Sequence, residues 1–298
     1  MKTRENVLSA LEVNKGVFIS GEELAKQIGV SRNSVWKAVK DLKEDGYIIE
    51  AVTNKGYRLS QSSDIISPQG IAAYLYDKKD VSYLEVYDKL ASTSLLAKEK
   101  ALTEDFDKHV IIARTQTAGK GHGKRFFDSP EGGIYISFII MPEHVKWDYL
   151  PLFVAVVAAE VLSEYYSDLS IKWVNDIYAS GKKICGILTE SVSDMETGEV
   201  SSYIIGIGIN CKINNKNKLI ADIINRIFYP DIYYQNKNLP DYYREKLMYI
   251  NERVKLVVYG EKPEEFYARL IDMDETGRLV VKKDDGTTEH IRSGQIVE

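Results

Sequence analysis

The first sixty residues place apolar side chains with the period of an α-helix. Leu24 and Ile28 are four residues apart, and Val35, Val39 and Leu42 form one apolar stripe along the next segment. The spacing predicts two short amphipathic helices in succession, each with one face turned toward a core.

Serine residues mark where the two helices begin. Ser20 is followed three residues later by Glu23, the spacing of a capping box, and Gly29 is placed to end this first helix. Ser31 is the expected N-cap of the second helix. The following stretch, "YIIEAVTNKGYRLS", predicts a β-hairpin. Together these elements predict a winged helix-turn-helix.

Beyond this region the pattern changes to alternating strands and helices. The polar stretch "SQSSDIISPQG" (60 to 70) predicts a linker in which Pro68 opens a helix. Strands are expected over "VSYLEVYDKL", "HVIIARTQT", "GGIYISFII" and "VSSYIIGIGINCKI", helices over "STSLLAKEKAL" and "YLPLFVAVVAAEVLSEYY", and a hairpin with its turn at Ser180 and Gly181. We predict an α/β domain with a mixed sheet.

The last segment, from Glu252 onward, has short alternating strands with turns at "DETG" and "DDG". It fits a small SH3-like β-barrel. The chain is therefore predicted to be an α/β multidomain protein with domains at 1–62, 66–250 and 251–298.

Charge is distributed unevenly along the chain. The whole sequence carries 39 Lys or Arg against 44 Asp or Glu, whereas the first sixty residues carry 10 against 8. Only this N-terminal part has the sign that favours DNA. A winged helix places its second helix in the major groove, so the candidate DNA-binding residues are Ser31, Arg32, Asn33, Lys37, Lys40 and Lys55. The alternative is a small helical domain that binds protein.

Composition limits the location and the metal chemistry. The longest apolar run (149 to 162) is too short to cross a bilayer, and the N-terminus lacks the pattern of a secretory signal. With only two cysteines, a reducing cytoplasm and no membrane contact are expected. The four histidines and two cysteines never reach a metal-ligand spacing, so no structural zinc site is expected.

The stretch "TQTAGKGHGKRFF" (115 to 127) combines glycines with basic side chains. It matches neither the phosphate loop of nucleotide triphosphatases nor the dinucleotide fingerprint. Glycines nevertheless let backbone N–H groups approach a ligand, and Lys120, Lys124 and Arg125 supply positive charge. The stretch indicates an anion-binding loop, with a solvated hairpin turn as the alternative.

Three further positions carry candidate chemistry. Ser92, Thr93 and Ser94 stand where a strand meets a helix, and they could cap the helix or orient a small polar ligand. Lys172 lies in the apolar strand of "IKWVND", either as an edge-strand charge or as a placed cation. The stretch "GIGIN" ends a strand with Asn210, whose amide could bind a ligand.

Five motifs stand in order along the chain: "STS", "QTAGKGH", "KWVND", "KICGILTE" and "GIGIN". With the winged helix before them and the small β-domain after them, the chain resembles, from end to end, the bifunctional biotin-protein ligases that also repress the biotin operon. The resemblance implies a class II synthetase-like central domain. It also implies ATP and Mg²⁺, with biotin as substrate and as precursor of the co-repressor.

The resemblance implies two chemical steps and a role for each motif. Biotin and ATP give biotinoyl-5′-AMP, and a lysine of a biotin carboxyl carrier domain then takes the biotinoyl group. Lys172 is the implied catalytic residue, bridging the biotin carboxylate and the α-phosphate. The implied biotin-binding residues are Ser92, Thr93, Ser94, Gln116, Lys120, Gly121, His122 and Lys172, and the implied nucleotide-binding residues are Arg125, Asn175, Asp176 and Asn210.

The same resemblance implies partners and regulation. The expected partners are the carrier domain of a carboxylase, operator DNA, and a second copy of the chain when the adenylate is bound. The C-terminal domain would help to bind ATP and the acceptor, or simply cover the core. Three alternatives remain: a repressor that senses biotin without turnover, a lipoate-type ligase, and a ligase whose winged helix is vestigial.

Two loop arginines of the family are Lys120 and His122 here, which replaces planar charged groups by a point charge and a titratable ring. We therefore expect His122→Arg to release biotinoyl-5′-AMP more slowly than the parent, measured as the decay of the purified protein–adenylate complex. Equal rates in the two proteins would contradict this interpretation.

Overall fold

The computed structural model describes residues 2–103, 108–123, 125–144, 150–194, 196–260 and 262–297. Lys124 of the basic stretch and Tyr149, the expected first residue of a helix, lie outside these ranges. The chain forms two compact units, the first made of residues 1–86 and 212–225 and the second of residues 87–211 and 226–298.

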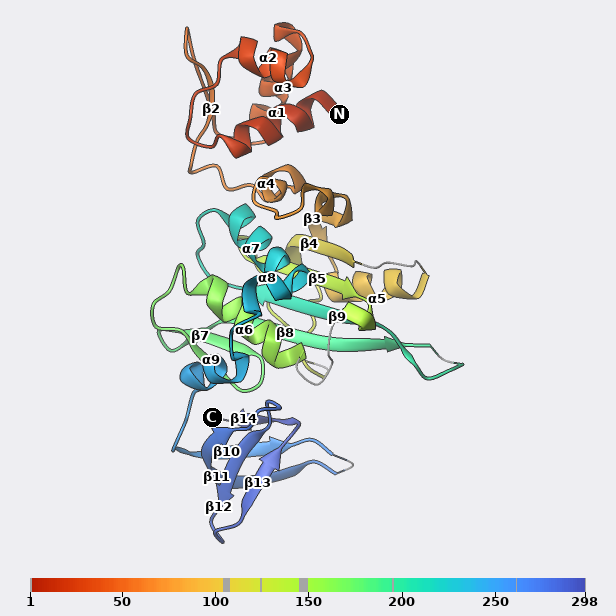
Figure 1. Ribbon diagram of the computed structural model, residues 1–298, viewed down its shortest axis with the longest axis vertical. Helices are drawn as coiled ribbons and strands as arrows, with labels where there is room; N and C mark the ends of the chain where they lie inside the picture. Colours follow the sequence, from red (N-terminus) through yellow and green to blue (C-terminus); the bar gives the residue numbers. More distant parts are fainter. Residues whose placement is uncertain are drawn as a thin grey trace. The chain divides into compact units, whose positions relative to one another are not determined.

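The N-terminal part of the first unit is a winged helix-turn-helix (Figure 1). Its three helices pack around Leu11, Leu24 and Leu42, which are fully buried. An antiparallel hairpin follows the third helix. The elements are α1 (Lys2–Val13), α2 (Gly21–Ile28), α3 (Arg32–Glu44), β1 (Ile49–Val52) and β2 (Gly56–Leu59).

The capping residues predicted from the sequence occupy their expected places. The Ser20 hydroxyl accepts the N–H of Glu23 at 3.0 Å, and the Ser31 hydroxyl accepts the N–H of Ser34 at 3.1 Å. Gly29 ends α2 with φ +74°, a left-handed conformation that glycine adopts without strain. The two predicted helices and the hairpin are confirmed.

The linker after the wing is held by the last part of the same unit. The Ser67 hydroxyl caps the short helix α4 (Pro68–Ala72), which precedes the 3₁₀ helix η1 (Lys78–Tyr83). Helix α7 (Lys216–Phe228) brings two buried asparagines to this linker. Asn217 accepts the N–H of Ser67 at 3.1 Å and donates to the Ile65 carbonyl at 2.8 Å, and Asn225 binds the backbone at residues 74 and 76.

The grouping into units therefore joins residues that are distant in sequence. The end of the linker and most of α7 belong to the unit that contains the winged helix, although residues 66–70 of the linker and all of α7 lie inside the range 66–250 drawn from the sequence. The three domain ranges, 1–62, 66–250 and 251–298, stay predictions.

A seven-stranded sheet forms the middle of the second unit, in the order β3-β4-β5-β9-β8-β7-β6. β3 reaches its neighbour β4 through a helix, the kind of connection that joins parallel strands, and the pairs from β4 to β6 are antiparallel. The predicted mixed sheet is confirmed. The strands are β3 (Leu84–Leu90), β4 (Lys108–Gln116), β5 (Ile134–Ile140), β6 (Ser170–Lys172), β7 (Asp176–Ala179), β8 (Lys182–Ser193) and β9 (Val200–Ile209).

Buried aliphatic side chains hold the helices against this sheet. Ala97 packs with Ile111, Ile139 and Ile204 in one cluster beneath the first helix after β3. The most apolar helix has eleven of its residues buried, which explains a run that is apolar all round. The helices are α5 (Thr93–Thr103), η2 (Pro142–His144), α6 (Leu150–Leu162), α8 (Pro230–Tyr234) and α9 (Leu239–Lys246).

The C-terminal segment forms a separate five-stranded antiparallel sheet in the order β13-β12-β11-β10-β14 (Figure 1). Among the described residues no pairing joins β13 to β14, so the sheet is open, and the SH3-like barrel stays a prediction. The strands are β10 (Arg253–Val258), β11 (Glu264–Met273), β12 (Leu279–Lys283), β13 (Thr288–Ile291) and β14 (Gly294–Val297).

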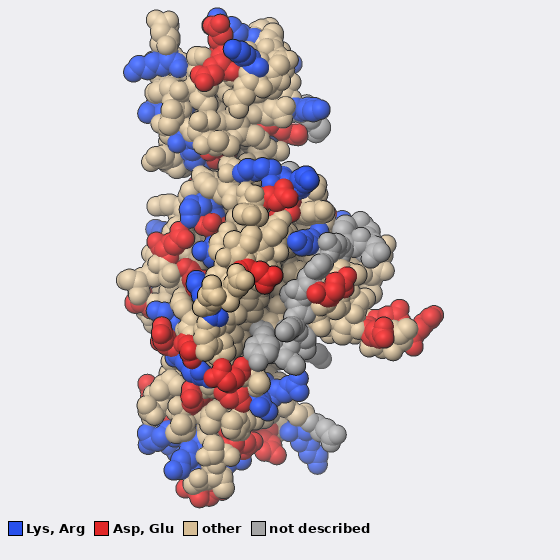
Figure 2. Space-filling view, viewed as in Figure 1, with Lys and Arg blue, Asp and Glu red and all other residues tan. Residues whose placement is uncertain are grey.

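The mixed surface charge and the short helices are as expected from the near balance of basic and acidic residues and the short apolar runs of the sequence. Figure 2 shows basic and acidic side chains intermixed over the face in view. Within the described ranges, every helix is too short or too polar to cross a membrane.

The two hydrogen bonds of Asn217 are the testable feature of this fold. In Asn217→Ala the Ser67 N–H and the Ile65 carbonyl lose their buried partner, which costs roughly 2 to 5 kcal/mol. We expect faster hydrogen exchange at residues 65–71 and a lower urea midpoint. Asn236→Ala, at an exposed position between α8 and α9, is the matched control and should change neither measurement. Equal behaviour of the two variants would show that Asn217 does not hold the linker.

Candidate functional site

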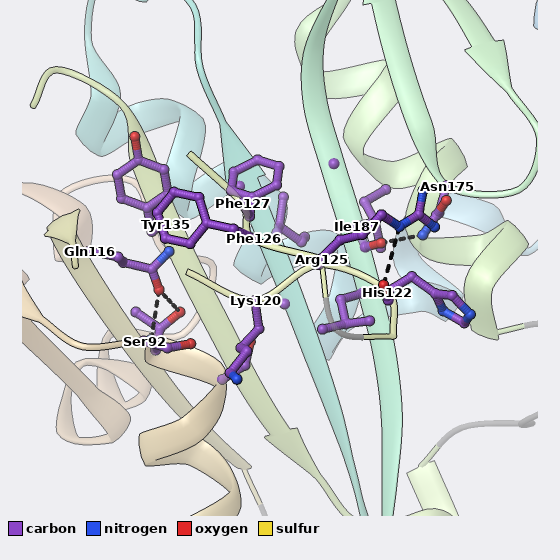
Figure 3. A pocket seen from close by; sticks show the side chains of 18 of the residues that line it. Ser92, Gln116, Lys120, His122, Arg125, Phe126, Phe127, Tyr135, Asn175 and Ile187 are labelled. Atoms are coloured by element: carbon purple, nitrogen blue, oxygen red, sulfur yellow. Dashed lines mark hydrogen bonds between the residues drawn. The ribbon is translucent and has the colours of Figure 1, made fainter. Parts of the chain in front are cut away.

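A cavity of about 140 Å³ opens between the ends of β4, β8 and β9 and the start of α5 (Figure 3). We call it cavity A. The basic stretch after β4 forms one side of it, and its described residues 117–123 and 125–127 are called the glycine loop below. Among the predicted site residues, cavity A is lined by Ser92, Thr93, Ser94, Gln116, Lys120, Gly121, His122, Arg125, Asn175 and Asp176.

A chain of neutral polar groups forms one end of cavity A. The Gln116 carbonyl oxygen accepts the N–H of Thr93 at 2.7 Å and its hydroxyl at 3.1 Å, and the Gln116 amide nitrogen donates to the Ser129 hydroxyl at 2.9 Å. The Ser137 hydroxyl donates to Thr93 at 2.8 Å and lies 3.1 Å from the Ser94 hydroxyl. Because these contacts fix the Gln116 amide, this end of the cavity is suited to a neutral ligand with matched donors and acceptors.

An aromatic ring explains the glycines of "KICGILTE" and "GIGIN". The Phe127 ring packs so close to the sheet that a Cβ on Gly208 would lie 2.3 Å from it and a Cβ on Gly186 would lie 2.7 Å from it. Lys183 places its ammonium 5.7 Å from the centre of the same ring. Cavity A therefore has an aromatic ring in its wall in addition to its hydrogen-bonding end.

The glycine loop folds as a small hairpin of its own. The Gly121 N–H donates to the Arg125 carbonyl and the Phe127 N–H to the Gly119 carbonyl, both at 2.9 Å. Lys120, His122 and Arg125 are exposed. The hairpin alternative and the anion-binding hypothesis are thus compatible, since the turn carries its basic side chains beside a cavity.

A second cavity of about 670 Å³, cavity B, lies between the central sheet and the C-terminal sheet. It shares His122, Arg125, Asn175, Asp176 and Leu188 with cavity A. Its cationic lining residues are Arg125, Lys172, Arg278 and Arg292, and Asp176 is the one carboxylate among its described lining residues. Positive charge thus gathers in cavity B, next to the neutral end of cavity A.

Lys172 ends β6 and lines cavity B. Its ammonium lies 5.9 Å from the ring centres of both Tyr178 and Tyr249, at the limit of a cation–π contact. Nearby, the Asp176 carboxylate pairs with Lys183 at 2.7 Å. The expected position of Lys172 beside a nucleotide's phosphates stays a prediction, and its place at the rim of cavity B favours it.

The two predicted asparagines have different surroundings. The Asn175 side-chain amide donates to the Ile187 carbonyl and lines both cavities. Asn210 lines neither cavity, because its amide donates to the Asp128 carbonyl at 2.7 Å and its oxygen accepts from Tyr135, also at 2.7 Å. Burial raises the pKa of Tyr135, so its hydroxyl remains protonated. Asn210 thus supports the wall of cavity A.

Sequence patterns missed several lining residues. Phe127, Lys183, Tyr259, Arg278 and Arg292 line the cavities, but the last three come from the C-terminal domain. No local motif indicated them, since their proximity arises from tertiary packing. Lys183 lies in the motif "KICGILTE", so its charge within a conspicuous motif is a sequence signal that could have indicated it.

The predicted DNA-binding residues lie on the exposed side of α3 and on the wing. Ser31, Arg32, Asn33, Lys37, Lys40 and Lys55 are all exposed. The Ser31 hydroxyl is also the cap of α3, and Lys40 lies 3.8 Å from Glu44. Trp36, which is 55% exposed between Arg32 and Lys37, was not singled out from the sequence.

Comparisons with known proteins agree with this architecture. The model of the Biotin/lipoate A/B protein ligase family matches residues 86–210, and that of an HTH domain matches residues 3–58. A solved structure, the biotin protein ligase from Aquifex aeolicus in complex with biotin and ATP, superposes with a TM-score of 0.59 and 26% identity, covering 72% of this chain and 97% of that one.

Curated relatives extend the similarity to both regions. The chain is 36% identical over 211 residues to the bifunctional ligase/repressor BirA of Bacillus subtilis (strain 168), a match that covers 70% of this chain and 64% of that protein. The match thus spans less than two thirds of that relative's length. The bifunctional ligase/repressor BirA of Escherichia coli (strain K12) is 30% identical over 305 residues, covering 93% of this chain and 92% of the relative.

The two family models and the fold define a protein ligase domain joined to a helix-turn-helix domain. The chain belongs to the family of bifunctional biotin ligase/repressor proteins. The resemblance inferred from the five motifs is confirmed.

Proposed function

We propose that the chain is an ATP-dependent biotin-protein ligase and a biotin-responsive transcriptional repressor. The observation that carries the ligase proposal is the junction of cavity A, with its neutral hydrogen-bonding end, and cavity B, with its gathered cations. The two cavities share His122, Arg125, Asn175 and Asp176. A ligand with a neutral ring system and a carboxylate would extend from A to meet a polyphosphate in B.

The proposed reaction has two steps. A biotin carboxylate oxygen attacks the α-phosphorus of ATP, and pyrophosphate leaves to give biotinoyl-5′-AMP. The amine of an acceptor lysine then attacks the acyl carbon, loses a proton and releases AMP. The first step needs two anions held together, and both steps need developing negative charge stabilised, which fixed cations and N–H donors provide without a protein nucleophile.

Each lining group has a role in this proposal. Thr93 and Gln116 would hold the ureido ring of biotin, because their amide and hydroxyl are already oriented by Ser129 and Ser137. Lys172 would lie between the carboxylate and the α-phosphate, and Arg125 would reach the phosphate oxygens. The wall formed by Phe127 would exclude water from the apolar part of the ligand.

Magnesium would be held at the junction of cavities A and B. Asp176 lines both cavities, and Mg²⁺ is commonly bound by one or two carboxylates together with substrate phosphates. Asp176 would therefore hold the ion, with Asn175 beside it, and the ion would neutralise charge on the phosphates. Lys183 now pairs with Asp176 and would have to give up part of this contact.

The acceptor, the oligomer and the location complete the proposal. The acceptor would be the biotin carboxyl carrier domain of a carboxylase, with the C-terminal domain, proposed to be SH3-like, helping to bind it and ATP. The adenylate-bound chain would form a homodimer that binds operator DNA through its winged helix. A carboxylase and operator DNA would both be met in the cytoplasm, which is the proposed location.

Lys172→Ala tests the ligase proposal. We expect the parent to transfer radiolabelled biotin to a purified carrier domain when ATP and magnesium are present. The variant should do so about 100-fold more slowly or worse, because removal of a group that stabilises developing charge has an effect of this size. Lys282→Ala, which removes an exposed lysine from β12, is the matched control and should match the parent.

Two results would contradict the ligase proposal. Labelling by Lys172→Ala at the parental rate would remove Lys172 from the chemistry. No labelling by a folded parent that binds biotin would favour the alternative of a repressor that senses biotin without turnover.

The DNA-binding hypothesis predicts different effects for two residues of α3. Arg32→Ala should weaken binding to the chain's own upstream operator by about 1 to 3 kcal/mol and reduce discrimination against scrambled DNA, because Arg32 is proposed to contact base edges. Lys37→Ala should weaken binding to both DNAs and lower the salt slope by about one unit.

Fluorescence anisotropy at several salt concentrations in the presence of biotin and ATP measures both effects. Lys282→Ala serves again as the charge-matched control. Parental binding by both α3 variants would favour the protein-binding interpretation or a vestigial winged helix.

A further inference from the structure

One contact joins the glycine loop to the C-terminal domain. The ring of His122 stacks on the ring of Tyr259, with ring centres 5.2 Å apart and an interplanar angle of 17°. In Figure 3 the His122 side chain points away from Gln116 and Ser92, so it reaches outward from cavity A. Both rings line cavity B.

The two ends of this contact differ in how firmly they are held. Tyr259 follows β10, and its N–H donates to the Ser293 carbonyl at 3.0 Å, which ties it to the chain just before β14. His122 stands at the tip of the exposed hairpin next to Gly121 and Gly123, and Gly123 has φ +68°. A stacked ring on a fixed partner therefore restricts a segment that has little packing of its own.

The stacking residue of the glycine loop, His122, is one of the two positions at which this chain differs from the loop motif of its family. The resemblance implies arginine where His122 stands, and arginine and histidine share a planar group that can stack on an aromatic face. His122 keeps the planar surface and gives up the permanent charge. Arg125, Arg278 and Arg292 also line cavity B, and Arg278 pairs with Asp274 at 2.9 Å.

We propose that Tyr259 is a positioning residue for the ligase reaction. Its ring holds His122, and through it the glycine loop, beside the junction of cavities A and B, so that biotinoyl-5′-AMP is retained until the acceptor arrives. The inference rests on the proposed function, since retention has a meaning only if the adenylate is made. It assigns the C-terminal domain a part in keeping the intermediate as well as in binding substrates.

Limited proteolysis tests the stack without any catalysis. Trypsin cleaves after Lys120 and Arg125 when the glycine loop opens. Loss of one aromatic stack should raise the cleavage rate roughly two- to tenfold in Tyr259→Ala and in His122→Ala. Tyr259→Phe and His122→Phe keep two stacked rings and should be cleaved at about the parental rate.

A double-mutant comparison separates the stack from general loosening. If the two rings act through each other, His122→Ala combined with Tyr259→Ala is cleaved no faster than either single variant. Tyr267→Ala removes an exposed tyrosine of β11 whose ring lies 4.8 Å from the Arg253 guanidinium, and it should behave as the parent. Multiplying effects in the double variant, or equal cleavage of Tyr259→Ala and Tyr267→Ala, would overturn the stack as the restraint.

Release of the intermediate tests the functional part. Biotinoyl-5′-AMP should leave Tyr259→Ala roughly two- to tenfold faster than the parent, with Tyr259→Phe restoring slow release and the same non-additivity with His122→Ala. Faster cleavage with unchanged release would refute the retention role while leaving the ligase intact. A parent that forms no adenylate would refute both the retention role and the ligase, and the proteolysis would still report on the stack.

Discussion

The segment from Lys172 to Asp176 is held by hydrogen bonds on three sides, and both cavities depend on it. The Trp173 indole donates to the Gly277 carbonyl of the C-terminal domain at 3.0 Å, and the Tyr243 hydroxyl of α9 donates to the Val174 carbonyl at 2.9 Å. Asn175 binds the neighbouring strand β8. Since Tyr243 is fully buried, this short segment cannot shift without disrupting the packing of α9.

The hydrogen bonds of Trp173, Val174 and Asn175 fix the backbone on which Lys172 and Asp176 stand. Because the backbone of this segment is already fixed, ligand binding has only the side-chain rotamers of Lys172 left to order. Arg244 contributes from the other side, because its guanidinium binds the Met273 carbonyl at 2.8 Å and contacts Glu275 in the turn that contains Gly277. The C-terminal turn is thus held next to Trp173 from two directions.

Local signals in the sequence were sufficient for the helices and hairpin of the winged helix and pointed to many of the residues that line cavity A. Ser20, Ser31 and Gly29 act within four residues of their position, so capping rules identify the helices that they bound. The motifs that line cavity A meet in space because they lie on neighbouring elements of one unit, the strands β4, β8 and β9 and the start of α5. Family resemblance then attached a chemistry to residues whose contacts no spacing could reveal.

Long-range packing accounts for what the sequence did not reveal. Asn217, to which the sequence analysis gave no role, is fully buried against a linker 150 residues earlier in the chain. Arg278 immediately precedes β12 and Arg292 immediately follows β13, and only the packing of the C-terminal sheet brings them to cavity B. Asn210, whose place at the nucleotide stays a prediction, hydrogen-bonds Tyr135 and the Asp128 carbonyl, and neither contact could be read from its motif.

In the proposed reaction, cavity A supplies neutral hydrogen-bonding groups and cavity B supplies positive charge. Buried hydroxyls and amides can be satisfied by one another, so the neutral end of cavity A is folded and oriented before a ligand arrives. Like charges buried together would cost far more, and Lys120 and Arg125 accordingly stay exposed on the glycine loop. A polyphosphate would supply the missing negative charge, so the cations reach their full effect only when both substrates are present. A segment that holds those cations beside the junction strengthens adenylate binding. By reciprocity, the bound adenylate strengthens the contact between that segment and the cations by the same factor.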